Sequence, residues 1–301
     1  MQPKQKKAWK QVDGVLLLDK PVGMSSNDAL QKARRLFSAA KGGHTGTLDP
    51  LASGLLPLCF GEATKFSADL LDADKTYEAE LQLGVTTDSG DAEGQVIATA
   101  AVAVSEAQVL AVLPQFTGAI EQVPPMHSAL KRDGRPLYEL ARQGIEVERA
   151  ARAITIHALD LLSFSGDRAR LRVRCSKGTY IRVLAADIGQ ALGCGAHLTA
   201  LRRTQVAELD LDGAVTLAEL EALDEADRPT RLAPVDALLS SLPLVELSPG
   251  AAERFRHGNP VPLPAGREGR LRVYAEGRLL GLGEPGPGGR LWPKRLVQSA
   301  A

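Results

Sequence analysis

Two segments of the chain alternate between apolar and polar residues with the period of a half-buried strand. Residues 75–84 place Tyr77 near the start of the apolar face, and residues 168–175 set four arginines against four small or apolar residues. A third segment, residues 14–20, is largely apolar and ends at Lys20. These patterns predict two strands with one buried face each and a third strand that is buried.

Helices are predicted for four other segments. They comprise residues 29–37, preceded by the candidate caps Ser25, Ser26 and Asn27, and residues 61–71, 105–115 and 181–192. The last of these helices places Tyr180 and Arg182 in its first turn. Its periodicity alone would make Arg182 a surface residue beside the apolar stripe.

A glycine-rich stretch, residues 42–54, lies between the first helix and the next apolar run. Four glycines in thirteen residues allow left-handed backbone or close approach to a ligand. Pro50 favours an extended conformation at Asp49, whose neighbours in sequence are apolar. The plain interpretation is a glycine turn with Asp49 bonded to its own backbone. A functional interpretation requires a cation for Asp49, and that cation must come from a distant part of the chain.

Length and composition predict one large domain and a small one. The chain has 301 residues, of which 44% are hydrophobic, enough for a sizeable core. Three cysteines without a C-x-x-C pair indicate neither a disulfide framework nor a zinc site. The N-terminal lysines precede no apolar segment of signal length, and no stretch has the length of a membrane span. We therefore expect a soluble cytoplasmic protein with no metal and no membrane partner.

The charges of the chain fall into blocks although the formal net charge is zero. Residues 126–182 and 254–295 each carry a net charge of +6, whereas residues 66–125 and 205–253 each carry −9. The blocks predict a basic face for nucleic acid and an acidic back. The alternative is that each block is only a solvated surface.

The order of residues in GGHTGTLDPLASGLL, from Gly42 onward, resembles the signature loop of the TruB-type tRNA pseudouridine synthases. The resemblance continues through Lys75-Thr-Tyr77, the 86–91 turn, Cys175-Ser-Lys-Gly-Thr-Tyr-Ile-Arg182 and residues 193–203, and it covers nearly all of the chain. It implies an α+β fold for residues 1–243, with a mixed, largely antiparallel sheet and flanking helices (the pseudouridine synthase fold). It also implies an RNA-gripping insertion at about 124–152 and a small PUA-like β-barrel over 244–301.

The resemblance assigns roles residue by residue. Asp49 is the expected catalytic residue, and Arg182 is aimed at it, so that a bidentate guanidinium would fix the direction of the carboxylate. Tyr77 would stack on the target base and is counted with both the catalytic and the substrate-binding residues. The other expected substrate-binding residues are His44, which would fill the space that the base leaves, Tyr180 and Leu201, which would wall the pocket, and Lys20. His127 stands where the family often has tyrosine, so no role is carried onto it.

The implied reaction is the isomerisation of uridine to pseudouridine at position 55, in the T-loop of tRNA, without cofactor or metal. The implied partner is the T-arm of tRNA, and we expect a monomer. A non-catalytic RNA-binding protein with a PUA module is the main alternative, but binding alone would not need Asp49, Tyr77 and Arg182 together. Ser128-Ala-Leu-Lys131 matches the S-x-x-K pattern of serine hydrolases, without the companion motifs of those enzymes.

Overall fold

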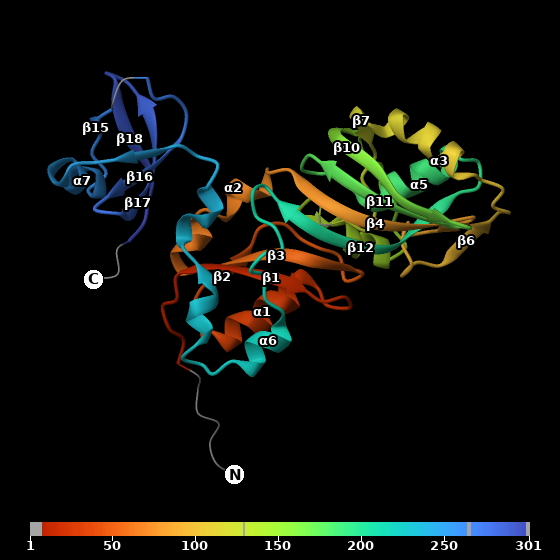
Figure 1. Ribbon diagram of the computed structural model, residues 1–301, viewed down its shortest axis with the longest axis horizontal. Helices are drawn as coiled ribbons and strands as arrows, with labels where there is room; N and C mark the ends of the chain where they lie inside the picture. The colour runs from red at the N-terminus through yellow and green to blue at the C-terminus, as the bar shows by residue number, and fades with distance from the viewer. Residues whose placement is uncertain (1–7, 129, 264–265, 299–301) are drawn as a thin grey trace, which may run out of the picture.

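The computed structural model describes residues 8–128, 130–263 and 266–298. Figure 1 shows a large body built around an extended sheet and a smaller C-terminal body joined to it by a connecting segment. No helix within the described residues is long and apolar enough to cross a membrane. Those residues also contain no group of three or more histidine, cysteine or acidic side chains that could hold a metal ion.

Nine of the described strands form the sheet of the large body. In spatial order they are β13 (Leu232–Ala233), β1 (Gly14–Lys20), β3 (Ala52–Phe60), β12 (Ala196–Val206), β4 (Lys75–Leu83), β11 (Arg168–Cys175), β10 (Arg152–Ser165) and β7 (Gly118–Gln122), with β2 (Gly42–His44) paired to β3. The β3–β12 pair is parallel and the other pairs are antiparallel. The predicted mixed, largely antiparallel sheet is confirmed.

Helices flank this sheet and bury its two halves against separate apolar clusters. The α-helices of the large body are α1 (Ser26–Leu36), α2 (Ser67–Leu71), α3 (Glu106–Val112), α5 (Ile181–Ala191) and α6 (Leu217–Ala222), and the 3₁₀ helices are η1 (Gly61–Lys65), η2 (Leu113–Phe116), η3 (Arg228–Arg231) and η4 (Val235–Leu239). Leu30 of α1 and Leu220 of α6 pack with β1 and β3, whereas Ile188 of α5 packs with β4 and β11. The Ser25 hydroxyl caps α1 by accepting from the Asp28 amide at 3.1 Å.

The strand predictions for residues 75–84 and 168–175 are confirmed. Every second residue of β11 is buried, and the arginines between them are exposed. The helix predicted for residues 61–71 is split, because η1 ends at Lys65 and α2 begins at Ser67.

The expected separation into a basic face and an acidic back is wrong for the central strands. Strands β4 and β11 are neighbours, so the arginines of one block pair with the carboxylates of another across the sheet. These pairs are Arg168–Glu80, Arg170–Glu78, Arg172–Glu78 and Arg174–Asp74, with separations between 2.5 and 3.7 Å. These parts of the two blocks therefore neutralise each other on one solvent-facing surface.

The C-terminal body is a five-stranded sheet, as far as the described residues go, with one helix packed on it. Its strands, in spatial order, are β14 (Leu244–Glu246), β16 (Leu271–Ala275), β17 (Arg278–Gly286), β18 (Arg290–Leu296) and β15 (Val261–Pro262), and the helix is α7 (Pro249–Arg256). Phe255 of α7 is fully buried against the sheet. This open half-barrel has the PUA-like architecture that the sequence predicts.

The C-terminal body shares an apolar cluster with the large body. Leu282 of β17 is fully buried in one cluster with Val15 and Leu55 of the central sheet and Leu238 of η4. The Arg270 guanidinium forms an ion pair with Asp69 in α2. Some of the basic charge near the C-terminus is therefore neutralised within the protein.

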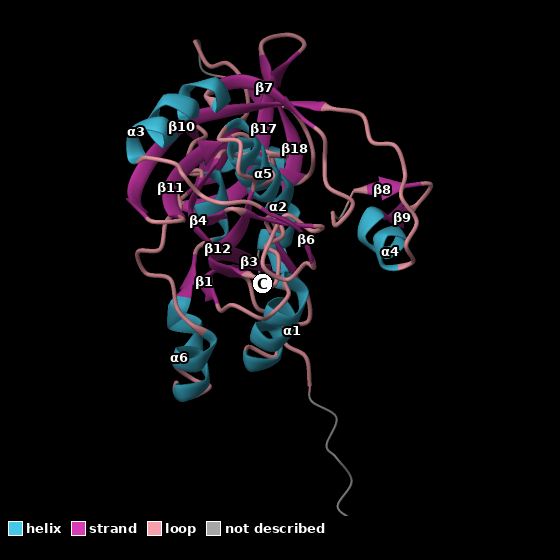
Figure 2. Ribbon diagram, turned by 90° about the vertical axis from the view of Figure 1, so that its right-hand side faces the viewer, coloured by secondary structure: helices cyan, strands magenta, loops and turns pink. Residues whose placement is uncertain are grey.

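Residues 124–150 stand apart from the sheet. The segment contains a two-stranded ribbon, β8 (Lys131–Arg132) and β9 (Arg135–Pro136), followed by α4 (Leu137–Arg142). Figure 2 shows these elements to one side of the large body, joined to it by extended loops. A second small ribbon, β5 (Val85–Thr87) with β6 (Val96–Thr99), follows β4 directly. The insertion expected at about 124–152 stays a prediction as an RNA-gripping element.

Candidate active site

Asp49 lies in the loop between β2 and β3, and the start of α1 holds that loop. The buried Ser26 hydroxyl accepts from the Leu48 amide at 2.7 Å and donates to the Leu48 carbonyl at 3.0 Å. The Gly23 amide donates to the Pro50 carbonyl at 2.8 Å. Asp49 is thus fixed from both sides, while its side chain stays 42% exposed. A held carboxylate that is open to solvent can meet a ligand.

The structure brings Arg182 to Asp49, although the two lie far apart in sequence. Arg182, in the first turn of α5, is only 6% exposed in its side chain, and its Nη2 lies 3.1 Å from Asp49 Oδ2. Nη2 also donates to the His127 carbonyl at 2.7 Å, and Nη1 donates to the Ser89 carbonyl at 3.3 Å. The contact with Asp49 joins one nitrogen to one oxygen, because the rest of the guanidinium serves other acceptors.

One of those acceptors, Asp91, was missed by the sequence reasoning. Its Oδ2 lies 3.4 Å from Arg182 Nη1, and its side chain is 5% exposed. Its Oδ1 accepts from the Ser89 hydroxyl at 2.5 Å and from the Glu93 amide at 3.1 Å. The signal was available in the 86–91 turn, which resembles the family, but that turn was given no role. Arg182 therefore bridges two carboxylates, one buried and one open to solvent.

Tyr77 lies on β4, directly opposite Arg203 of β12 and Val173 of β11. It packs against both apolar clusters of the sheet, as Leu201 does. Burial raises the pKa of the Tyr77 phenol, and the nearby Arg203 opposes that rise by its charge and a hydrogen bond. The Asp49 carboxylate is also close enough to raise this pKa.

Tyr180 precedes α5 and is tied to the far edge of the sheet. Its amide donates to Gln122 Oε1 at 2.8 Å, and its carbonyl accepts from Gln122 Nε2 at 3.1 Å. Leu201 pairs with Ala79 of β4 and Ala52 of β3, so it lies on the strand between the Tyr77 strand and the strand that follows Asp49. Both side chains are half-buried.

Lys20 lies deeper, whereas His44 is half-buried like Tyr180 and Leu201. Burial, followed by the Arg203 charge, lowers the pKa of His44, and the buried His44 Nδ1 has no hydrogen-bond partner among the described residues. Lys20 is fully buried, and its Nζ donates to the Pro21 carbonyl at 2.8 Å and the Met24 carbonyl at 2.6 Å. Burial lowers the pKa of Lys20 to about 8, against the attraction of Asp49. The Lys20 ammonium holds the turn between β1 and α1, and its role in substrate binding stays a prediction.

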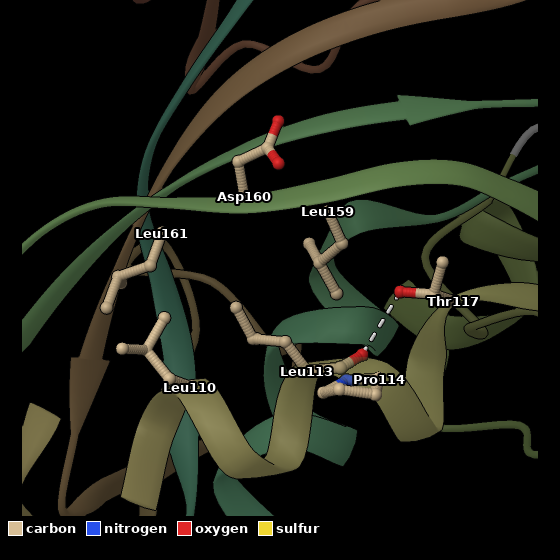
Figure 3. A pocket seen from close by; sticks show the side chains of 7 residues that line it. All are labelled: Leu110, Leu113, Pro114, Thr117, Leu159, Asp160 and Leu161. Atoms are coloured by element: carbon tan, nitrogen blue, oxygen red, sulfur yellow. Dashed lines mark hydrogen bonds between the residues drawn. The ribbon is translucent and has the colours of Figure 1, made fainter. Parts of the chain in front are cut away.

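A surface hollow lies away from these residues. Figure 3 shows it between the α3–η2 segment and β10. Its lining is largely apolar and consists of Leu110, Leu113, Pro114, Thr117, Leu159, Asp160 and Leu161. None of the residues expected to bind or transform a substrate lines it.

The arrangement of sheet, insertion and C-terminal half-barrel is the pseudouridine synthase fold. Among solved structures, the protein aligns with a chain of an H/ACA RNP bound to a substrate RNA containing 2′-deoxyuridine, with a TM-score of 0.72 and 23% identity over 95% of this chain and 85% of that chain. A chain of a Cbf5–Nop10–Gar1 complex gives a TM-score of 0.69 and 27% identity over 94% of this chain and 84% of that chain.

Comparison of the sequence with known proteins shows the family to which the chain belongs. Residues 34–181 match the N-terminal domain of the TruB family pseudouridylate synthases, residues 182–240 the tRNA pseudouridylate synthase B C-terminal domain, and residues 243–297 the pseudouridine synthase II TruB C-terminal region. The tRNA pseudouridine synthase B of Dechloromonas aromatica (strain RCB) is 77% identical over 98% of this chain and 99% of its own length. That of Aromatoleum aromaticum is 61% identical over 96% of this chain and 94% of its own length. The chain belongs to the TruB family of pseudouridine synthases and is an isomerase.

Proposed function

We propose that this enzyme isomerises uridine to pseudouridine in the T-loop of tRNA, at position 55, with Asp49 as the reacting group. The tRNA substrate is supported by relatives at 77% and 61% identity that are named tRNA pseudouridine synthase B. The observation that carries the role of Asp49 is its contact with Arg182, at 3.1 Å. A buried guanidinium that orients a solvent-open carboxylate is what a reacting group requires and what binding alone does not.

The reaction conserves electrons and needs no outside reactant. The bond between C1′ and N1 of uridine breaks, the base turns, and a bond between C1′ and C5 forms. The proton on C5 leaves, and N1 gains a proton. A positioned carboxylate can serve by attack at C1′, by attack at C6 or by removal of the 2′ hydrogen, and each of these roles fits Asp49.

The target base must leave its stack in a folded RNA loop, at a cost of a few kcal/mol. Tyr77 offers an aromatic face for that base, worth about 1–3 kcal/mol. Tyr180 and Leu201 wall the space, which retains the detached uracil, and His44 occupies the place that the base leaves in the RNA. Lys20 supports the floor of the site from the turn after β1.

Catalysis and additional RNA binding are assigned to consecutive parts of the chain. Residues 1–243 form the catalytic domain, and its insertion at about 124–152 presents the exposed Lys131, Arg132 and Arg135 to the T-arm. Residues 244–301 form a PUA-type RNA-binding module that contributes phosphate contacts. The protein acts as a cytoplasmic monomer, and the T-loop is recognised mainly by its shape and its phosphates.

Tritium release from a tRNA transcript labelled at C5 of uridine tests the function, because only substitution at C5 expels that label. We expect stoichiometric release from the normal transcript and none when cytidine replaces uridine at position 55. Asp49→Asn should abolish release and keep tRNA affinity within about threefold, since the amide keeps the shape and loses the charge. Asp72→Asn, at a carboxylate that is 70% exposed, is the matched control and should be fully active. Turnover by Asp49→Asn near the wild-type rate would refute the assignment.

A further inference from the structure

Arg203 is the largest side chain that the described part of the chain buries completely, with 1% of its surface exposed. A guanidinium carries several N–H donors and a permanent charge, so burial is costly unless acceptors meet it. Two of its acceptors are backbone carbonyls, since Nε donates to Leu55 at 2.8 Å and Nη2 to Gly46 at 3.1 Å, and the Tyr77 phenol is a further hydrogen-bond partner. No carboxylate in the described ranges forms an ion pair with it. The sequence pattern predicted no role for Arg203.

The place of Arg203 in the sheet connects the two halves of the candidate site. Strand β12 lies between β3 and β4, and Arg203 is opposite Gly54 on one side and Tyr77 on the other. Gly46, whose carbonyl it holds, begins the loop that carries Asp49. Leu55, whose carbonyl it also holds, lies in the strand that follows that loop. One residue therefore contacts the loop of Asp49, the strand that follows that loop and the strand of Tyr77.

The backbone around Arg203 leaves it little freedom. Gly54 has φ +98°, and a Cβ there would lie 2.2 Å from the Arg203 carbonyl oxygen, which only glycine avoids. Gly46 has φ +99°, and a Cβ there would lie 3.7 Å from Arg203 Nη1. Gly54 thus lets β3 lie directly against the Arg203 backbone, and Gly46 supplies a left-handed residue where its carbonyl meets the guanidinium. Burying a guanidinium in this way costs free energy, which indicates that Arg203 has a role beyond packing.

We propose that Arg203 is a positioning residue that sets the distance between Asp49 and Tyr77, by clamping the Gly46 and Leu55 carbonyls from the position opposite Tyr77 on the neighbouring strand. The inference rests on the proposed function of this site. It assigns to β12 the task of holding the reacting carboxylate and the stacking ring on opposite sides of one base. Arg203 acts through these groups and need not touch the RNA.

Arg203→Lys keeps the charge and loses the planar fork that reaches two carbonyls at once. We expect the single-turnover rate of tritium release at saturating tRNA to fall about tenfold or more, with the tRNA dissociation constant within about threefold of wild type. A purely structural role would lower both the melting temperature and the amount of active protein, and would leave the rate per folded molecule unchanged.

Fluorine NMR separates the two roles. The chain has four tyrosines, and in protein labelled with 3-fluorotyrosine the Tyr77 resonance is identified by its loss in Tyr77→Phe. Arg203→Lys should shift that resonance, because the cation on the residue paired with Tyr77 moves. The neighbouring Arg202, which pairs with Asp19 at 2.7 Å, supplies the matched control Arg202→Lys. Leu291→Ala, in the core of the C-terminal half-barrel, supplies a destabilised control. Neither control should shift the Tyr77 signal or slow the reaction beyond about threefold.

A wild-type rate in folded Arg203→Lys, or an equal loss of rate in Leu291→Ala at equal melting temperature, would overturn the proposal. If Arg203→Lys does not fold, Gly46→Ala carries the test, since it disturbs the same carbonyl and keeps the arginine. A wild-type rate in Gly46→Ala would then overturn it. Release of tritium by the wild-type enzyme in the same assay is independent of both variants, so failure of the proposed function would be recognised separately.

Discussion

Arg182→Lys is the sharpest test of the candidate site. The guanidinium reaches four acceptors: Asp49 Oδ2, Asp91 Oδ2 and the carbonyls of Ser89 and His127. A lysine ammonium is a point charge on a flexible stem and cannot span these positions. The variant keeps the positive charge, so the buried Asp91 retains a counter-ion. It loses the geometry that fixes Asp49.

The structure sets the size of the effect. A hydrogen bond to a charged group contributes about 1.5–3 kcal/mol, and we expect lysine to lose two of the four contacts. Because the Asp49 side chain is 42% exposed, solvent recovers part of this loss. A net loss of about 2–4 kcal/mol in the transition state corresponds to a rate about 30- to 1,000-fold lower.

The assay is single-turnover tritium release at saturating tRNA, with affinity measured by filter binding and folding by thermal denaturation. Arg174→Lys, at an arginine that is 61% exposed, is the matched control and should keep the wild-type rate. The reasoning fails if folded Arg182→Lys reacts within about threefold of wild type, or if weaker tRNA binding accounts for the whole deficit.

Tyr77→Phe should retain most activity and Tyr77→Ala should lose capture of the base, since stacking needs the ring; single-turnover rates showing equal losses would point instead to proton transfer by the phenol. Gly54→Ala places a methyl group 2.2 Å from the Arg203 carbonyl at φ +98° and should lower the melting temperature by about 5 °C or more, whereas Gly43→Ala, with nothing within 4 Å, should leave it unchanged. A chain truncated after Leu242 should bind tRNA with a shallower salt dependence and should also be less stable, because Leu282 belongs to a core shared with the large body. A truncated chain with the full melting temperature would contradict that coupling.

Local pattern was enough to predict much of the fold. The alternation in residues 75–84 places Ala79, Leu81 and Leu83 on the buried face of β4, as the structure has them. The cap at Ser25 fixes the start of α1. These features depend on neighbours within a few residues, for which the period of the apolar positions is a sufficient guide. The split between η1 and α2 was missed because a single distorted residue, Phe66, interrupts an otherwise helical segment.

The meeting of Asp49 and Arg182 could not be predicted from period and propensity. The stripe of α5 makes Arg182 a surface residue, and only the family resemblance aims it at Asp49. Its burial depends on Ser89 and Asp91 of the 86–91 turn and on His127 at the base of the insertion. These segments are far apart in the sequence and meet only in the folded chain. The position of the guanidinium is therefore a tertiary property.

The buried cations show a more general limit. Arg203, Lys20 and Lys75 are each buried, and each donates hydrogen bonds to two or more backbone carbonyls. A search of the sequence for complementary charges cannot find such partners, because every residue carries a carbonyl. Conversely, the charge blocks predicted an RNA-binding face. Arginines of one block instead form ion pairs with carboxylates of another across β4 and β11. In this protein a buried charge therefore says more about the fold than a surface charge does. A buried cation requires backbone carbonyls at fixed positions around it, whereas a surface charge requires no particular backbone.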